Sequence, residues 1–184
     1  GIPIRVGVNG GSLQPAIRAK YGAPVPGALV ESAMEHIALL EAEDFTDIVI
    51  SLKTSTVESM IAANRQLAAR IPYPIHLGVT EAGGGEAARL KSAIGIGALL
   101  CDGIGDTLRV SLTDDPVAEV SAARDILTAL AVDGQCGMDI ISCPTCGRTK
   151  IDLIDLAARF RAAAEKEGLL SLPLRVALMG CPVN

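Results

Sequence analysis

The chain has 184 residues, of which 49% are hydrophobic and 2% aromatic, and its formal net charge at pH 7 is −5. The acidic balance argues against a nucleic-acid-binding surface, because neutralising phosphates requires clustered Lys and Arg. No apolar run reaches the roughly 20 residues that cross a bilayer, and the N-terminus shows no signal-peptide pattern. A core built from Ala, Val, Ile and Leu is typical of a parallel sheet covered by helices.

Four β-rich runs are each followed by a segment with helical periodicity; the runs are residues 4–9, 47–53, 75–80 and 107–113. Alternating strands and helices predict a parallel sheet with right-handed crossovers. Polar residues gather near the carboxyl ends of these strands, where (β/α)8 barrels hold their chemistry. Four such units make half of a TIM-type barrel, which we expect over residues 1–134. A flavodoxin-like open sheet is the alternative, although no glycine-rich phosphate loop of the usual form follows the first run.

Apolar stripes indicate which side of each helical segment faces the sheet. Ser55 and Glu58 have capping-box spacing at the start of the second segment. Pro116 behind Asp115 marks the start of the last one, and the third is expected over residues 92–100. The inward-facing residues expected in the first, second and fourth segments are, in that order, Leu29, Ala33, Ile37 and Leu40; Val57, Ile61, Asn64 and Ala68; and Val120, Ala123, Leu127 and Leu130.

A second, smaller domain is expected over residues 135–184. Its elements form one βαβ unit, in which a right-handed crossover puts the carboxyl ends of both strands on the same side. Gly168 is expected to end the helix of this unit. The expected elements are a strand at residues 138–142, a helix at about 150–167 and a strand at 174–179.

Three cysteines follow the strands of this second domain and are candidate metal ligands. Cys143 and Cys146 are spaced for one metal centre, and the crossover would bring Cys181 beside them. An iron–sulfur cluster, a structural zinc site and a redox dithiol all remain possible at this point. A zinc ribbon would need a second cysteine pair, which the sequence lacks. We expect Cys101 to be a buried apolar residue and Cys136 to be incidental.

Three cations lie on or at the ends of otherwise apolar strands: Arg5, Lys53 and Arg109. A charge that faces a barrel interior is costly unless it is paired. Gathered at one mouth, the three would suit a diphosphate, which spreads its charge over several oxygens. The alternative is ion pairing inside the barrel, for example with Glu81.

Neutral polar residues and one carboxylate accompany these cations. Asn9 and Ser111 are candidate binding partners at the same strand ends, with strand-end capping as the alternative. Glu81 precedes three glycines, 83–85, and is a candidate general acid or base beside a mobile loop, with a surface loop residue as the alternative. We expect His76, within a strand, to be a core histidine with its hydrogen bonds satisfied.

Several of these segments together resemble the 4-hydroxy-3-methylbut-2-enyl diphosphate synthase family. The resemblance implies a barrel followed by a [4Fe-4S] domain. It also implies two-electron reductive ring opening and dehydration of 2-C-methyl-D-erythritol 2,4-cyclodiphosphate in bacterial isoprenoid biosynthesis. Ferredoxin or flavodoxin would supply the electrons, and the full-length protein would be a cytoplasmic homodimer. The segments that carry the resemblance are residues 4–13, 76–83, 91–95, 103–112, 143–148 and 179–184.

The resemblance also implies a role for each candidate residue. Cys143, Cys146 and Cys181 match the three cluster thiolates, and a fourth ligand, a Glu, is expected beyond Asn184. Glu81 matches a carboxylate that assists proton transfer. We interpret the chain as a fragment and expect it to be inactive alone; the alternative function is a zinc-stabilised, non-catalytic α/β binding module. The positions that match substrate- and diphosphate-binding residues are Arg5, Asn9, Lys53, Arg109 and Ser111.

Overall fold

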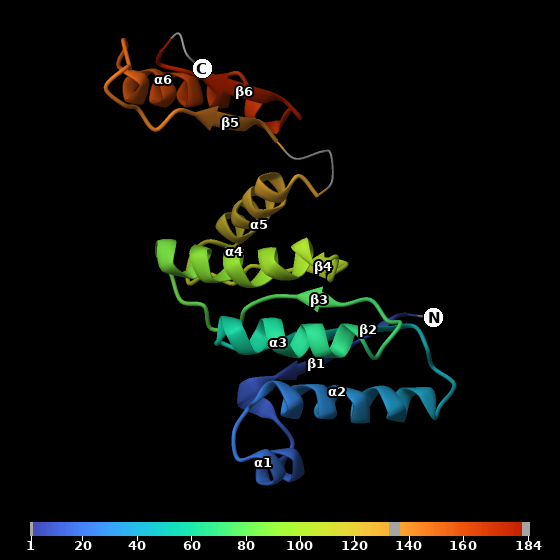
Figure 1. The fold of residues 1–184 in the computed structure, drawn as a ribbon. Coiled ribbons are helices and arrows are strands. Elements are labelled where there is room, and N and C mark those ends of the chain that lie inside the picture. The colour runs from blue at the N-terminus through green and yellow to red at the C-terminus, as the bar shows by residue number, and fades with distance from the viewer. Residues whose placement is uncertain (1, 133–136, 182–184) are drawn as a thin grey trace. The chain divides into compact units, whose positions relative to one another are not determined.

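The computed structural model describes residues 2–132 and 137–181. They form two compact units, Gly1–Ile126 and Leu127–Asn184, whose elements are shown in Figure 1. The domain boundary predicted between residues 134 and 135 lies outside the described residues. Cys136 also lies outside them. Because the two units are not placed relative to each other, each is described separately.

The first unit contains four parallel strands, as the sequence predicts. Strand β1 (Ile4–Asn9) pairs with β2 (Ile48–Lys53), and β3 (His76–Leu77) pairs with β4 (Thr107–Leu108). A parallel bridge between Ile50 and Ile75, the residue before β3, places β2 beside β3, so the strands follow the order β1-β2-β3-β4. The last two strands are much shorter than predicted. The Thr80 N–H donates to the Thr54 carbonyl, 3.3 Å away, so the segment after β3 stays bonded to the segment after β2.

Helices follow the strands and cover the sheet, as in Figure 1. On α2 the predicted stripe is confirmed at Leu29, Ala33 and Ile37, which are buried, whereas Leu40 is only half-buried. On α3 only Asn64 of the predicted stripe is buried, and the apolar residues buried with it are Met60, Ala63 and Leu67. The helices and short 3-10 turn of this unit are η1 (Gly10–Ser12), α1 (Pro15–Tyr21), α2 (Pro26–Glu41), α3 (Val57–Ala68), α4 (Gly85–Cys101) and α5 (Pro116–Leu130).

Two local predictions about helix α3 and the end of α4 are wrong. The capping box does not form, because Thr56 is the N-cap of α3 and makes no side-chain cap bond. The Thr56 N–H donates instead to Thr54 Oγ1, 3.2 Å away. Cys101 is exposed, because it is the last residue of α4 and the preceding turn buries Leu99 in its place.

The predicted inward stripe of α5 is also wrong at Val120, which is 55% exposed, whereas Ala122 and Ile126 are buried. Two polar contacts fix the rotation of this helix. Glu119 Oε1 accepts a hydrogen bond from the Leu112 N–H at 2.8 Å. Asp125 lies 3.9 Å from Arg89 of α4.

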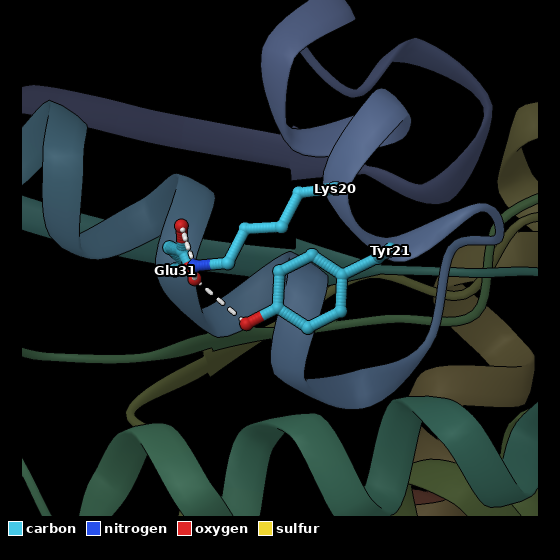
Figure 2. A network of polar contacts seen from close by, with 3 residues as sticks. All are labelled: Lys20, Tyr21 and Glu31. Carbon is cyan, nitrogen blue, oxygen red and sulfur yellow. Dashed lines mark hydrogen bonds and ion pairs between the residues drawn. The ribbon is translucent and has the colours of Figure 1, made fainter.

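A polar network attaches α1 to α2. Glu31 on α2 accepts hydrogen bonds from Lys20 Nζ, at 2.8 and 2.7 Å, and from the Tyr21 hydroxyl at 2.7 Å. Figure 2 shows both side chains reaching from α1 to this carboxylate. Gln14, just before α1, also accepts a hydrogen bond from Ser32 on α2 at 2.5 Å. These contacts hold α1 against α2 beside the carboxyl end of β1.

The second unit contains the predicted βαβ arrangement. Strands β5 (Asp139–Ser142) and β6 (Arg175–Leu178) are parallel. Helix α6 (Leu153–Lys166) starts after the predicted position, because Asp152 is its N-cap and accepts a hydrogen bond from the Asp155 N–H at 3.0 Å. A short 3-10 turn, η2 (Leu169–Ser171), follows Gly168, whose φ of 68° ends the helix as predicted. No helix in the described part of the chain is long and apolar enough to span a membrane.

Candidate functional site

Strand register places most of the predicted binding residues on one face of the four-stranded sheet. Successive side chains of a strand alternate between faces, so Arg5, Gly7 and Asn9 share a face with Val49, Ser51 and Lys53, their partners on β2. The Ile50–Ile75 bridge continues this face to His76, which pairs with Thr107, and Arg109 lies two residues further on. We call the surface formed by Arg5, Asn9, Ser51, Lys53, His76 and Arg109 the polar face.

Lys53 is the buried cation of the polar face, with 8% of its surface exposed. Burial, followed by the positive charges of Arg109 and Arg5, lowers the pKa of its ammonium from the usual 10.5 to about 8. The three predicted cations therefore lie close enough to repel one another. The structure forms no ion pair to Arg5, Lys53 or Arg109 from any described carboxylate, so the predicted alternative of pairing with Glu81 is wrong.

The position of Arg109 depends on two neighbours. Its Nε and Nη2 lie 3.1 and 2.8 Å from Ser111 Oγ and donate to it. Gly78 on the adjacent strand segment leaves room for its backbone, since a Cβ there would lie 2.8 Å from the Arg109 carbonyl oxygen and 3.4 Å from Lys53 Cε. Sequence reasoning predicted Arg109 and Ser111 but missed Gly78. The signal available was its place in the run His76-Leu77-Gly78, where a glycine interrupts a strand.

A cavity of about 560 Å³ lies at the carboxyl ends of β1 and β2. Asn9 and Glu81 line it, together with Arg18 of α1 and Thr54, neither of which sequence reasoning had singled out. The three cations of the polar face are not among its lining residues. Glu81 has a φ of 55°, a left-handed conformation that costs a residue with a Cβ about 1–2 kcal/mol. Backbone strain at a cavity wall is a frequent feature of functional sites.

His76 is buried, at 5% exposure, but only one of its ring nitrogens has a partner. Its Nδ1 lies 2.8 Å from Thr107 Oγ1 on β4. Its Nε2 is buried with no hydrogen-bond partner, so the prediction of a fully satisfied core histidine is wrong. Burial, followed by the charges of Lys53, Arg5 and Arg109, lowers the pKa of the ring from 6.5 to about 4. The imidazole is therefore neutral near pH 7.

The cysteines of the second unit follow its two parallel strands. Cys143 comes directly after β5, and its N–H donates to the Leu178 carbonyl of β6 at 3.1 Å. The Lys150 N–H, in the turn after Cys146, donates to the Gly180 carbonyl at 2.8 Å, directly before Cys181. The backbones that carry the three thiols therefore meet at one end of this two-stranded sheet.

The surroundings of Cys146 favour a thiolate. Hydrogen bonds from the backbone and side chain of Arg148, then from Thr149, lower the pKa of the Cys146 thiol. The Cys146 N–H in turn donates to Thr149 Oγ1 at 3.1 Å. No group of three or more His, Cys, Asp or Glu residues within 2–132 and 137–181 is arranged around a single metal ion. The cysteine thiolates that hold an iron–sulfur cluster each bind a different iron atom, so such a cluster does not require three ligands around a single ion.

Parallel β/α units whose polar residues gather towards the carboxyl ends of the strands are typical of α/β proteins of the barrel class. A family model described as the GcpE TIM-barrel domain matches residues 1–124, and one described as the GcpE protein C-terminal domain matches residues 139–184. The chain therefore belongs to the GcpE family, as the resemblance in its sequence indicated.

Curated relatives from several bacteria are similar to the whole chain. Proteins of Fusobacterium nucleatum and Caldanaerobacter subterraneus are each 55% identical to it, and one of Clostridium perfringens is 53% identical. All three bear the name 4-hydroxy-3-methylbut-2-en-1-yl diphosphate synthase (flavodoxin). The matches cover 100% of this chain and 51% of each relative, so the chain spans about half the length of these proteins.

Proposed function

We propose that the chain is part of a 4-hydroxy-3-methylbut-2-en-1-yl diphosphate synthase. Residues 1–134 supply the second half of its TIM-type barrel, and residues 135–184 begin its [4Fe-4S] domain. The enzyme reduces 2-C-methyl-D-erythritol 2,4-cyclodiphosphate by two electrons from flavodoxin or ferredoxin, opening its ring and releasing water. It acts as a homodimer in the bacterial cytoplasm. The family membership and the names of the relatives support this proposal. Neither supports a zinc-stabilised binding module.

The observation that carries the proposal is that Arg5 and Arg109 act on the buried ammonium of Lys53, while no described carboxylate forms an ion pair with any of the three. Clustered, unpaired cations destabilise a fold unless an anion neutralises them. Arg contributes forked hydrogen bonds and Lys a point charge, so the three together suit the several oxygens of a diphosphate. Asn9 lies opposite Lys53 on β1, and Ser111 orients Arg109. We assign these five residues to diphosphate and substrate binding.

The proposed catalytic carboxylate is that of Glu81. It lines the cavity that adjoins Asn9, and no ion pair holds it among the described residues. A carboxylate beside the substrate ring would give or take a proton as the ring carbon–oxygen bond breaks and the hydroxyl leaves as water. The strained backbone at Glu81 would fix its carboxylate relative to the bound diphosphate.

The proposed cluster ligands are Cys143, Cys146 and Cys181, with a Glu beyond Asn184 as the fourth. The donor set fits a cluster, because thiolates are its usual ligands and the hydrogen bonds around Cys146 favour the deprotonated sulfur. A [4Fe-4S] cluster held there would pass the two electrons of the donor to the substrate one at a time. Residues of the second unit hold the thiolates and their hydrogen bonds, while those of the polar face bind and orient the substrate.

The test is the binding of pyrophosphate to the purified chain, measured by isothermal titration calorimetry. Lys53→Met should weaken binding at least about tenfold, because a charge-assisted contact contributes about 1.5–3 kcal/mol. Lys91→Met is the matched control, since Lys91 is exposed on helix α4 and is not a residue of the polar face. Equal affinity of both variants and the wild type would refute the anion site.

A further inference from the structure

We propose that His76 is a further ligand-contacting residue, whose neutral Nε2–H donates a hydrogen bond to the anion held by the three cations of the polar face. This inference rests on the proposed function, because it places the same diphosphate against the same face. It concerns a residue whose other ring nitrogen is fixed by Thr107. His76 thereby differs from a core histidine that serves packing alone.

The first support is the missing partner of Nε2. A buried polar atom without a hydrogen bond costs about 1–3 kcal/mol, and nearly all such atoms in folded proteins have a partner. Here two such atoms lie on one face of neighbouring strands, Nε2 of His76 and Oγ of Ser51. The bridge between Ile50 and Ile75 makes these two residues cross-strand neighbours. A ligand oxygen on the polar face would satisfy both.

The second support is the position of His76 among charges. The groups that act on its ring are Lys53, Arg5 and Arg109, all cationic. An anion drawn to these cations would therefore lie next to the ring. The ring is neutral, so it adds a hydrogen-bond donor without adding a fourth repelling charge to the unliganded protein.

The tautomer follows from the partner of Nδ1. The Thr107 hydroxyl, 2.8 Å from Nδ1, can donate to that nitrogen, which leaves the proton on Nε2. The opposite tautomer would turn the Nε2 lone pair towards an anion, which is repulsive. Thr107 therefore acts as a positioning residue that fixes both the orientation of the ring and the site of its proton.

Two substitutions separate the two nitrogens. His76→Gln places an amide near the position of Nε2 and loses the Nδ1 contact, whereas His76→Asn retains an amide near Nδ1 and loses the distal donor. Pyrophosphate affinity should fall about tenfold in His76→Asn and stay within about threefold of the wild type in His76→Gln. The reverse order, or equal affinities in correctly folded variants, would overturn the inference.

Nitrogen-15 NMR of the histidines of the unmodified chain tests the same point without a substitution. The chain contains two histidines, so His36, which lies 3.1 Å from Gln14 on the α1–α2 side, is an internal control. At saturating pyrophosphate the Nε2–H of His76 should shift and exchange more slowly with solvent, while His36 stays unchanged. A proton on Nδ1 of His76, or no response, would overturn the inference.

The outcomes also separate this inference from the proposed function. If pyrophosphate binding depends on Lys53 but neither the His76 variants nor the His76 NMR signals respond, the anion site stands and His76 is not part of it. Absence of pyrophosphate binding by the wild-type chain would overturn both.

Discussion

Replacing Lys53 by Met should stabilise the unliganded chain and reduce its stabilisation by pyrophosphate. The buried ammonium has a pKa of about 8 instead of 10.5, because burial and then the charges of Arg109 and Arg5 disfavour its charged form. At about 1.4 kcal/mol per unit, this shift corresponds to a cost of about 3 kcal/mol at pH 7. Methionine fills a similar volume without the charge, so we expect a gain of about 1–3 kcal/mol in the free energy of unfolding.

The sign of the pH dependence gives this prediction a second check. The folded-state pKa of Lys53 is lowered, so between pH 8 and 10.5 the unfolded chain binds more protons than the folded chain at this residue. The contribution of Lys53 to the free energy of unfolding therefore rises with pH across that window. The advantage of Lys53→Met should shrink accordingly between pH 7 and pH 10.5.

Urea unfolding followed by circular dichroism measures both effects, with Lys91→Met as the control for losing an exposed lysine. A fixed concentration of pyrophosphate should raise the urea midpoint of the wild type and of Lys91→Met more than that of Lys53→Met. A Lys53→Met variant that is less stable than the wild type at pH 7, or a stability difference that does not change with pH, would refute the reasoning.

Three further predictions concern the neighbours of this site. The pKa of His76 is lowered to about 4, so between pH 6.5 and 4 the unfolded chain binds more protons at this residue than the folded chain. The free energy of unfolding should therefore decrease as pH falls through this range. His76→Gln should weaken this dependence in urea titrations at pH 4.5 and 7. Gly78→Ala should lower pyrophosphate affinity by at least about tenfold, because the alanine Cβ would displace the Arg109 backbone. Gly27→Ala is the control, since a Cβ there would make only ordinary contacts and should leave the affinity unchanged. Unchanged affinity of Gly78→Ala in calorimetry would contradict the prediction. Tyr21→Phe should speed hydrogen exchange of the α1 amides, because it removes one of the contacts to Glu31, and identical exchange in mass spectrometry would count against that role.

Much of the fold follows from local patterns in the sequence. The alternation of strands and helices predicts the parallel pairing of β1 with β2 and of β5 with β6, and Gly168 marks the end of α6. Helix rotation is less predictable where long-range polar contacts fix it. The Glu119 bond to the Leu112 N–H turns Val120 outward on α5, although Val120 fits an apolar stripe.

The candidate site likewise contains residues that the sequence predicts and residues that it does not. The cations Arg5, Lys53 and Arg109 stand out in sequence as charges within apolar strands, and register brings them together. The role of Gly78 depends on a close approach between two strand segments, which no spacing in the sequence encodes. The unpartnered nitrogen of His76 likewise becomes visible only when every neighbour of the buried ring is known.

A crystal structure of the chain grown with pyrophosphate tests the central claim most directly. We predict pyrophosphate oxygens in contact with Lys53 Nζ and with the guanidinium groups of Arg5 and Arg109, on the polar face of the sheet. Pyrophosphate bound elsewhere, for example at Arg18 in the adjoining cavity, with the three cations left unliganded, would contradict the account.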